Sequence, residues 1–249
     1  MGGVLLAGES WVTQATHYKG FDSFTSVTFH SGADEFLAGL RRQGIEVEHL
    51  YAHDVPDRFP GDRDSLAAYD VIILSDIGAN SFLLPQDTWL HGRSRTNRLA
   101  LLADWVRAGG GLMMAGGYLS FQGFQARANF ARSPIAEVLP VAMSDYDDRV
   151  EAPQGIHPAI ADPDHPIGRA WRPNPPAILG YNRVAVKPGT RVVATVGEDV
   201  LIAAAEHGAG RAAVWTSDIG PHWCPVELSR WEGFEPVMAA IVRWLRREI

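Results

Sequence analysis

The sequence is poor in cysteine, and it has no long apolar run. Cys224 is the single cysteine among 249 residues, so no internal disulfide can form, as is typical of proteins in the reducing cytoplasm. No stretch approaches the roughly 18 consecutive apolar residues that a membrane span needs. The segment 1–9 enters a strand-like apolar run at once, without the charged region and cleavage site of a secretory signal. We therefore expect a cytoplasmic protein without a membrane partner.

The chain also lacks the basic surface of a nucleic-acid-binding protein. It carries 22 Lys and Arg residues against 29 Asp and Glu residues, which gives a formal net charge of −7. Its longest basic runs are the Arg-Arg pairs at 41–42 and 246–247. Because binding to a phosphate backbone needs a basic patch, nucleic acid is excluded as an expected partner.

Motifs for cofactors and metals are missing as well. The glycine clusters at 109–111 and 208–210 match turns rather than a dinucleotide fingerprint, and no Walker sequence is present. No spacing of His or Cys matches a zinc site. Asp145, Asp147 and Asp148 lack the glycine and distal Glu of a calcium loop, which favours a solvated turn. We expect no cofactor and no metal.

What the chain does contain is an alternation of short apolar runs with helical patterns. Runs that are apolar on both faces predict buried strands, and apolar residues at helical spacing predict helices. Strands are expected at 2–8, 45–52, 69–76 and 111–117, and helices at 32–44 and 96–111. This order predicts an α/β fold with a mostly parallel sheet and helices on both faces. A hydrophobic content of 46% is enough for the core of one domain over 1–249.

The remaining segments have other compositions. Nine prolines between 140 and 190 indicate an irregular Pro-rich loop region within the domain. Three short strands are expected over 190–218, followed by an amphipathic helix at 226–247. About 20 residues separate the first strand from the first helix, and a loop of that length is usually a lid, a binding loop or a contact surface.

Polar and aromatic residues follow several of the expected strands. Ligands of open parallel sheets bind beyond the carboxyl ends of the strands, so these residues are the candidate ligand-binding groups. They are Glu9, Lys19, Asp76, Asn80, Ser120, Gln122 and Trp223. Three of them have structural alternatives, since Ser120 could cap a helix, Gln122 could bind backbone groups, and Trp223 could anchor its loop.

Two motifs carry a resemblance to a known family. Residues 116–123 read G-G-Y-L-S-F-Q-G, and residues 218–223 read D-I-G-P-H-W. With the order of elements, they make the chain similar to the class I glutamine amidotransferase-like superfamily, and within it to amidotransferase-like cytoplasmic proteins related to ThuA-like proteins. The resemblance implies a flavodoxin-like, doubly wound sheet. In active amidotransferases a nucleophilic cysteine occupies the turn after a strand, and Tyr118 stands at the matching position.

This difference predicts that glutaminase chemistry is lost. The family mechanism needs a thiolate, and a phenol with a pKa near 10 cannot replace it. Tyr118 could instead act as a hydrogen-bond donor or general acid, or could fill the vacated pocket. Asp218 could orient His222 as a general base. Cys224 could be a displaced nucleophile, or could pack under the last helix.

Three functions therefore stay open. The first is binding or processing of an unknown small molecule by a protein that has lost the glutaminase nucleophile. The second is a non-catalytic assembly or sensing protein, and the third is a hydrolase that uses Cys224 or the Asp218–His222 pair. We expect a homo-oligomer in each case, because aromatic residues gather in 17–29 and near the C-terminus.

Overall fold

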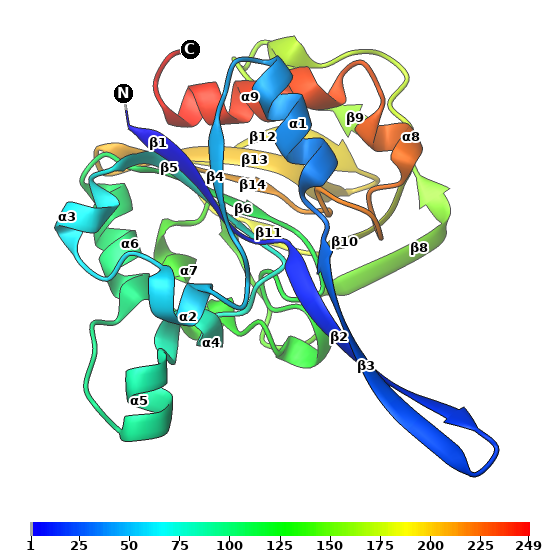
Figure 1. Ribbon diagram of the computed structural model, residues 1–249. Helices are drawn as coiled ribbons and strands as arrows, with labels where there is room; N and C mark the ends of the chain where they lie inside the picture. The colour runs from blue at the N-terminus through cyan, green and yellow to red at the C-terminus, as the bar shows by residue number, and fades with distance from the viewer. Residues whose placement is uncertain (1) are drawn as a thin grey trace.

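The computed structural model describes residues 2–249, and Met1 lies outside the described residues. An eight-stranded sheet forms the centre of the molecule (Figure 1). Its strands, in spatial order, are β4 (Val47–Leu50), β1 (Gly3–Gly8), β5 (Tyr69–Ser75), β6 (Gly111–Ala115), β14 (Gly210–Trp215), β13 (Asp199–His207), β12 (Arg191–Val196) and β9 (Pro158–Ile160). The first five are parallel and the last three are antiparallel additions. The predicted α/β class is confirmed.

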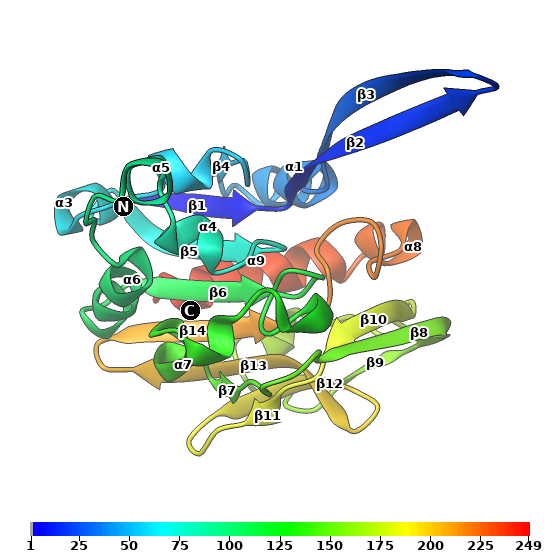
Figure 2. The same ribbon diagram turned by 90° about the horizontal axis from the view of Figure 1, so that it is seen from below.

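Helices cover both faces of this sheet (Figure 2). On one face α1 (Asp34–Arg42) and α9 (Phe234–Leu245) pack against side chains such as Leu6 of β1. On the other face, α6 (Arg98–Arg107) and α7 (Ile135–Val138) pack against the strand side chains that point the opposite way, such as Leu5 of β1. Because successive side chains of a strand point to opposite faces, strands buried on both faces are apolar throughout.

Several short helices were not visible in the sequence pattern. They are α2 (Val55–Arg58), α3 (Arg63–Leu66), α4 (Asn80–Leu83) and α5 (Gln86–His91), with 3₁₀ turns at Phe124–Ala126, Phe130–Arg132 and Gly168–Ala170. Each spans fewer than two turns, which is too short for a helical period to show. The single helix expected at 226–247 is wrong, since α8 (Val226–Ser229) and α9 are separate helices. Among residues 2–249, no helix is long and apolar enough to cross a membrane.

The strand order places a topological switch at β1. From β1 the chain first adds β4 on one side and then returns to add β5 on the other side. The helices that follow β1 and β5 therefore cover opposite faces of the sheet, and ligands of such sheets bind beyond the carboxyl ends of the strands at this point.

The long connection after β1 is a β-hairpin, not the loop that its length suggested. β2 (Ser10–Lys19) and β3 (Asp22–Ser31) form ten consecutive antiparallel pairs, and the ribbon projects from the body (Figure 1). The physical reason is local: the segment is rich in Val, Thr and aromatic residues, and Gly20 has a φ of 68° in its two-residue turn.

The Pro-rich segment 140–190 contains more regular structure than its composition indicated. Besides β9 it holds β7 (Val141–Ala142), β8 (Arg149–Ile156), β10 (Ile178–Asn182) and β11 (Ala185–Val186), paired as β8 with β10 and β7 with β11. Pro153 lies in β8 where the register with β10 shifts. Proline is tolerated in two-stranded sheets at such irregular positions, because the missing N–H is not needed there.

Candidate functional site

Three acidic residues meet at the carboxyl ends of the central strands. Glu9 follows β1, Asp76 follows β5, and Asp218 lies in the loop after β14. The turn after β6 passes between two of them at Gly117, where an added Cβ would lie 2.8 Å from Oδ1 of Asp76 and 2.9 Å from Oδ1 of Asp218. The two carboxylates therefore lie against the same backbone position, and only glycine fits between them.

The backbone is strained at this position in the fold. Glu9 has a φ of 47°, Asp76 a φ of 42° and His222 a φ of 131°, although none of them is glycine. Such conformations cost roughly 1–3 kcal/mol each and persist where the surroundings hold them. For Glu9 the holding contact is its N–H, which donates to the carbonyl of Ser75 at 2.8 Å. Clustered strain of this kind is typical of functional sites.

Glu9 is the most enclosed of the three acids. Its side chain is buried, and Ser75 Oγ donates a 2.6 Å hydrogen bond to Glu9 Oε2. Burial, together with the charges of Asp218 and Asp76, raises the pKa of Glu9 to about 8. Burial and the charge of Asp218 also raise the pKa of Asp76, to about 6. At neutral pH Glu9 is therefore mostly protonated, while Asp76 is mostly ionised.

Asp218 holds the imidazole of His222. Asp218 Oδ2 lies 3.1 Å from His222 Nδ1 and also accepts a 3.0 Å hydrogen bond from the backbone N–H of Trp223. Asp218 is buried, whereas the His222 side chain is 45% exposed. The hydrogen bond that the ring donates to Asp218 is the main cause that raises the pKa of His222. Among residues 2–249, the hydrogen bond of the His222 ring is made by Nδ1, and no hydrogen bond involves Nε2.

Tyr118 lies beside this histidine. The two rings meet edge to face with their centroids 4.5 Å apart. The Tyr118 hydroxyl donates to Glu151 Oε1 at 3.0 Å, and Nε1 of Trp223 donates to Glu151 Oε2 at the same distance. Burial and the Glu151 hydrogen bond raise the pKa of Tyr118, so its oxygen stays a hydroxyl at neutral pH. Glu151, on β8, was missed because nothing in the Pro-rich segment marks it.

The turn after β6 differs from the nucleophile turn that the family resemblance implies at Tyr118. Its positive φ angles fall at Gly117, Phe121 and Gly123, not at Tyr118, and a 3₁₀ turn rather than an α-helix follows. The expected helix cap at Ser120 is therefore wrong: Ser120 Oγ accepts a 3.0 Å hydrogen bond from the N–H of Asp76. In return Asp76 Oδ1 accepts from the N–H of Leu119 at 2.7 Å. Strand β5 and the turn after β6 are thus fastened to one another.

The buried carboxylate of Asp148 binds backbone N–H groups of this turn. Asp148 accepts hydrogen bonds from the backbone N–H groups of Gln122 and Gly123 and from Nδ2 of Asn182, all within 2.9 Å. Asn182 Oδ1 in turn accepts from the N–H of Gly117 at 3.0 Å. The expectation that Asp148 lies in a solvated turn is wrong, because its side chain is buried. Gln122 Oε1 accepts a 3.3 Å hydrogen bond from the backbone N–H of Ala131. This contact matches the structural alternative for Gln122, in which its side chain binds backbone groups.

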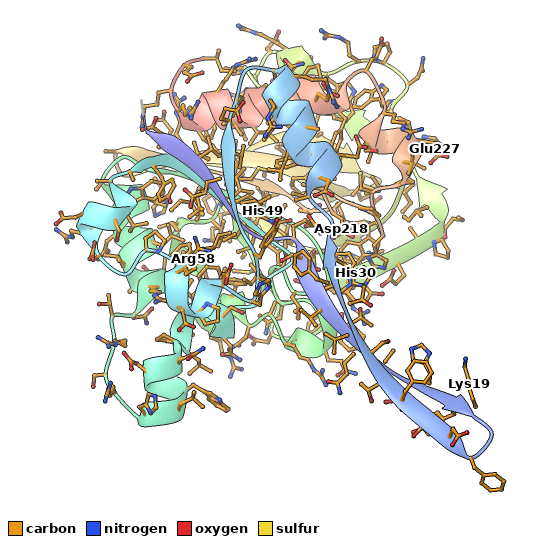
Figure 3. All side chains as sticks on the ribbon, in the orientation of Figure 1. Lys19, His30, His49, Arg58, Asp218 and Glu227 are labelled. Carbon is orange, nitrogen blue, oxygen red and sulfur yellow. The ribbon has the colours of Figure 1, made fainter. Side chains whose placement is uncertain are left out.

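Three predicted site residues are not joined to the acidic cluster. Lys19 lies at the far end of the hairpin, away from Asp218 (Figure 3). Asn80 is exposed at the start of α4, and within residues 2–249 no hydrogen bond links its side chain to the cluster. Cys224 is buried in the core beneath α9, and burial, with the charges of Asp218 and Glu9, raises the pKa of its thiol.

A cavity of about 590 Å³ lies elsewhere, among residues of 142–150, 183–186 and 198–200. Neither Glu9, Asp76 nor Asp218 lines it. Its charged side chains include Arg149 and Arg183, each already paired with an aspartate. Within residues 2–249, no group of three or more His, Cys, Asp or Glu side chains is placed to hold a metal ion.

A comparison with protein families shows which family the chain resembles. The model of the family described as "Putative glutamine amidotransferase" matches residues 3–247. The chain belongs to this family. No curated protein matches the chain.

Solved structures agree with the assignment to the amidotransferase-like family. The chain is 40% identical to cytoplasmic protein STM3548 from Salmonella typhimurium over 98% of both chains, with a TM-score of 0.94. It is 41% identical to cytoplasmic protein STM1381 from Salmonella typhimurium LT2 over 98% of this chain and 99% of that one, with a TM-score of 0.92. A ThuA-like protein from Bacteroides uniformis shares the fold, at 10% identity and a TM-score of 0.55, over 98% and 91% of the two chains.

Proposed function

We propose that this amidotransferase-like protein binds a small molecule at the acidic cluster and exchanges protons with it through His222. The observation that carries the proposal is the Asp218–His222 contact of 3.1 Å at the end of β14. A carboxylate on Nδ1 fixes the tautomer and the orientation of an imidazole, so that Nε2 can serve as a general base or acid. Glu9, with a pKa of about 8, is a proton donor of matched strength.

The charges of the site favour one class of ligand. Glu9, Asp76 and Asp218 offer carboxyl oxygens, which accept hydrogen bonds from hydroxyl and amino groups. Arg149, whose guanidinium lies 4.7 Å from the centroid of the Tyr118 ring, is already paired with Asp147. An anionic ligand would be repelled by the ionised acids, whereas a neutral or cationic molecule that presents hydroxyl or amino groups would be held. Tyr118 adds an aromatic edge of the kind that lines sites for ring-shaped ligands.

Glutamine hydrolysis by a thiolate is not part of the proposed function. Tyr118 occupies the position of the family nucleophile, and its phenol has a raised pKa. The single cysteine, Cys224, is buried and its thiol pKa is raised too. A nucleophilic thiolate needs the opposite conditions, namely exposure and a lowered pKa. We also propose that the protein is cytoplasmic, because its two Salmonella relatives are named as cytoplasmic proteins.

A thermal-shift comparison tests the proposed function. The wild type and Asp218→Asn are each titrated with glucose and sorbitol as hydroxyl ligands, putrescine as an amino ligand, and citrate as an anion. At least one hydroxyl or amino ligand is expected to raise the melting temperature of the wild type and not that of Asp218→Asn. Asp199→Asn is the control, because this acid pairs with Tyr181 and Arg183 away from the cluster.

Two results would contradict the proposal. One is a shift caused by citrate alone, which would mean that the site recognises anions. The other is an equal shift in the wild type and in Asp218→Asn, which would mean that the ligand binds elsewhere.

A further inference from the structure

The β2–β3 hairpin, called the arm from here on, stands away from the body in both views (Figure 1 and Figure 2). Its ten-residue strands reach about 30 Å at roughly 3.3 Å per residue. In the described part of the chain β2 and β3 pair only with each other. A two-stranded ribbon without further packing is at best marginally stable in water. The body contacts the arm at its base, where Phe29 packs against Tyr51 and His53, so the outer part of the arm needs packing from another surface.

Both faces of the arm expose large apolar side chains. The exposed set comprises Trp11, Val12, Tyr18, Phe21, Phe24, Val27 and Phe29. Directly paired residues share a face, so Val12 and Phe29 lie on one face and Phe24 lies with His17 on the other. Phe21 is fully exposed at the tip. An apolar surface that continues along both faces marks an interaction site rather than ordinary surface.

The arm also lacks the devices that protect a free strand edge. Monomeric proteins guard such edges with Lys, Pro or bulges. Between residues 10 and 31 the only formally charged side chains are Lys19 and Asp22, and there is no proline. The ten pairs run without a register shift, so no bulge interrupts the ribbon. Aromatic enrichment with depletion of charge is the composition of an interface core.

We propose that the arm docks on a second copy of this chain, in a two-fold pair in which each arm covers the other copy. Five aromatic side chains of the arm expose on the order of 600 Å² together. Even with one face of each arm covered, both arms and the partner surfaces that they contact together reach the roughly 1,200–2,000 Å² of a stable interface. Lys19 and Asp22 cancel, so a neutral arm meets the body that carries the net charge of −7 without repulsion.

The same composition argues against other occupants. A membrane or a nucleic acid would be attracted by clustered basic residues, and the arm has one lysine. A different protein would leave the arm uncovered whenever that protein was absent. A second copy is present wherever the chain is made, and closed two-fold pairs are the commonest protein assemblies. The inference is independent of the chemistry proposed for the acidic cluster.

Sedimentation mass with two kinds of variant tests the arm. In the shortened variant Asn-Gly replaces residues 11–30, because Ser10 and Ser31 are directly paired and a two-residue turn spans them. The second variant, called the point variant, carries three substitutions together: Tyr18→Ser, Phe21→Ser and Phe24→Ser. The wild type is expected at an even multiple of 27.2 kDa at micromolar concentration, and both variants at half that mass or less. The control carries Trp89→Ser and Tyr146→Ser, both 71% exposed on the body, and keeps the wild-type mass.

Circular dichroism and a melting curve show that each variant is folded. The shortened variant keeps the whole body, so its mass decides the question if the point variant does not fold. A wild type of 27.2 kDa, an odd-numbered assembly, or arm variants with the wild-type mass would overturn the proposal. So would a monomeric wild type that binds phosphatidylserine vesicles through the arm, which would assign the surface to a membrane.

Discussion

Asp218 and His222 form a carboxylate–imidazole pair, with Oδ2 of the acid 3.1 Å from Nδ1 of the ring. The acid is buried and the ring is partly exposed, so one partner is fixed and the other is accessible. The pair stands beside Glu9 and Asp76, and their charges couple the titration of the whole cluster.

Replacing Asp218 with Asn is expected to lower the pKa of His222. The hydrogen bond to the carboxylate raises that pKa in the folded protein, so the pair stabilises the fold most below the unfolded pKa of about 6.5. This stabilisation is lost as the pH rises through the folded pKa. NMR titration of the ring protons measures the change. Asp199→Asn is the control, and an equal His222 pKa in the wild type and Asp218→Asn would refute the pairing.

Replacing Glu9 with Gln is expected to flatten the dependence of stability on pH. Burial raises the pKa of Glu9 from 4.5 to about 8. As the pH rises from 4.5 to 8, the unfolded chain gives up a proton that the folded chain keeps, so the wild type loses stability over this range. One proton corresponds to a slope of at most about 1.36 kcal/mol per pH unit. Gln keeps an oxygen that can accept the hydrogen bond from Ser75.

Urea unfolding at a series of pH values measures this slope. The control is Glu46→Gln, whose side chain is exposed and paired only with Arg41 at the surface. If the Glu9→Gln variant has the same slope as the wild type, Glu9 is ionised in the folded protein and the assignment of a proton donor is wrong.

Replacing Tyr118 with Phe is expected to cost roughly 1 kcal/mol, because one hydrogen bond to Glu151 is lost. The melting temperature should fall by only a few degrees. Tyr181→Phe is a matched control, since the Tyr181 hydroxyl donates to Asp199 at 2.6 Å. Both variants should lose similar stability, but only Tyr118→Phe should weaken the thermal shift given by a hydroxyl or amino ligand. Equal ligand shifts in the two variants would show that Tyr118 is only a packing residue.

Replacing Gly117 with Ala is expected to disrupt the acidic cluster. The added methyl would lie within 2.9 Å of both Asp76 and Asp218, and the φ of 139° is strained for any residue with a side chain. Gly189→Ala is the control, because Gly189 also has a positive φ but its added methyl meets nothing within 4 Å. Gly117→Ala should be less stable than the control by about 2 kcal/mol or more. An equal loss of stability in Gly117→Ala and Gly189→Ala would mean that the carboxylates of Asp76 and Asp218 move apart without cost.

The purified protein is expected to release no ammonia from glutamine above the background of heat-denatured protein. The reason is that the chain has one cysteine, and Cys224 is buried with a raised pKa. A coupled glutamate dehydrogenase assay measures ammonia. Glutamine turnover that Cys224→Ala abolishes would contradict this expectation and would make Cys224 the nucleophile.

The sequence by itself determined most strands of the central sheet and where each of them ends, although not β9 at its edge. Segments such as β1 and β5 are apolar throughout because both faces of a central parallel strand are buried, and each ends where polar residues begin. The carboxyl ends of such strands converge, so Glu9, Asp76 and Asp218 are site candidates on the sequence alone. The local pattern therefore fixes which residues reach this edge of the sheet.

Only the tertiary structure decided what surrounds these residues. The hydrogen bonds of Glu151 and Asp148 to the turn after β6 join segments separated by more than 20 residues, and no local period encodes such a contact. The protonation of Glu9 depends on burial and on acids distant in sequence, so it follows from packing alone. The hairpin is a contrasting case: its residues favour strand, but only the fold reveals that the ribbon leaves the body with large apolar side chains exposed on both faces.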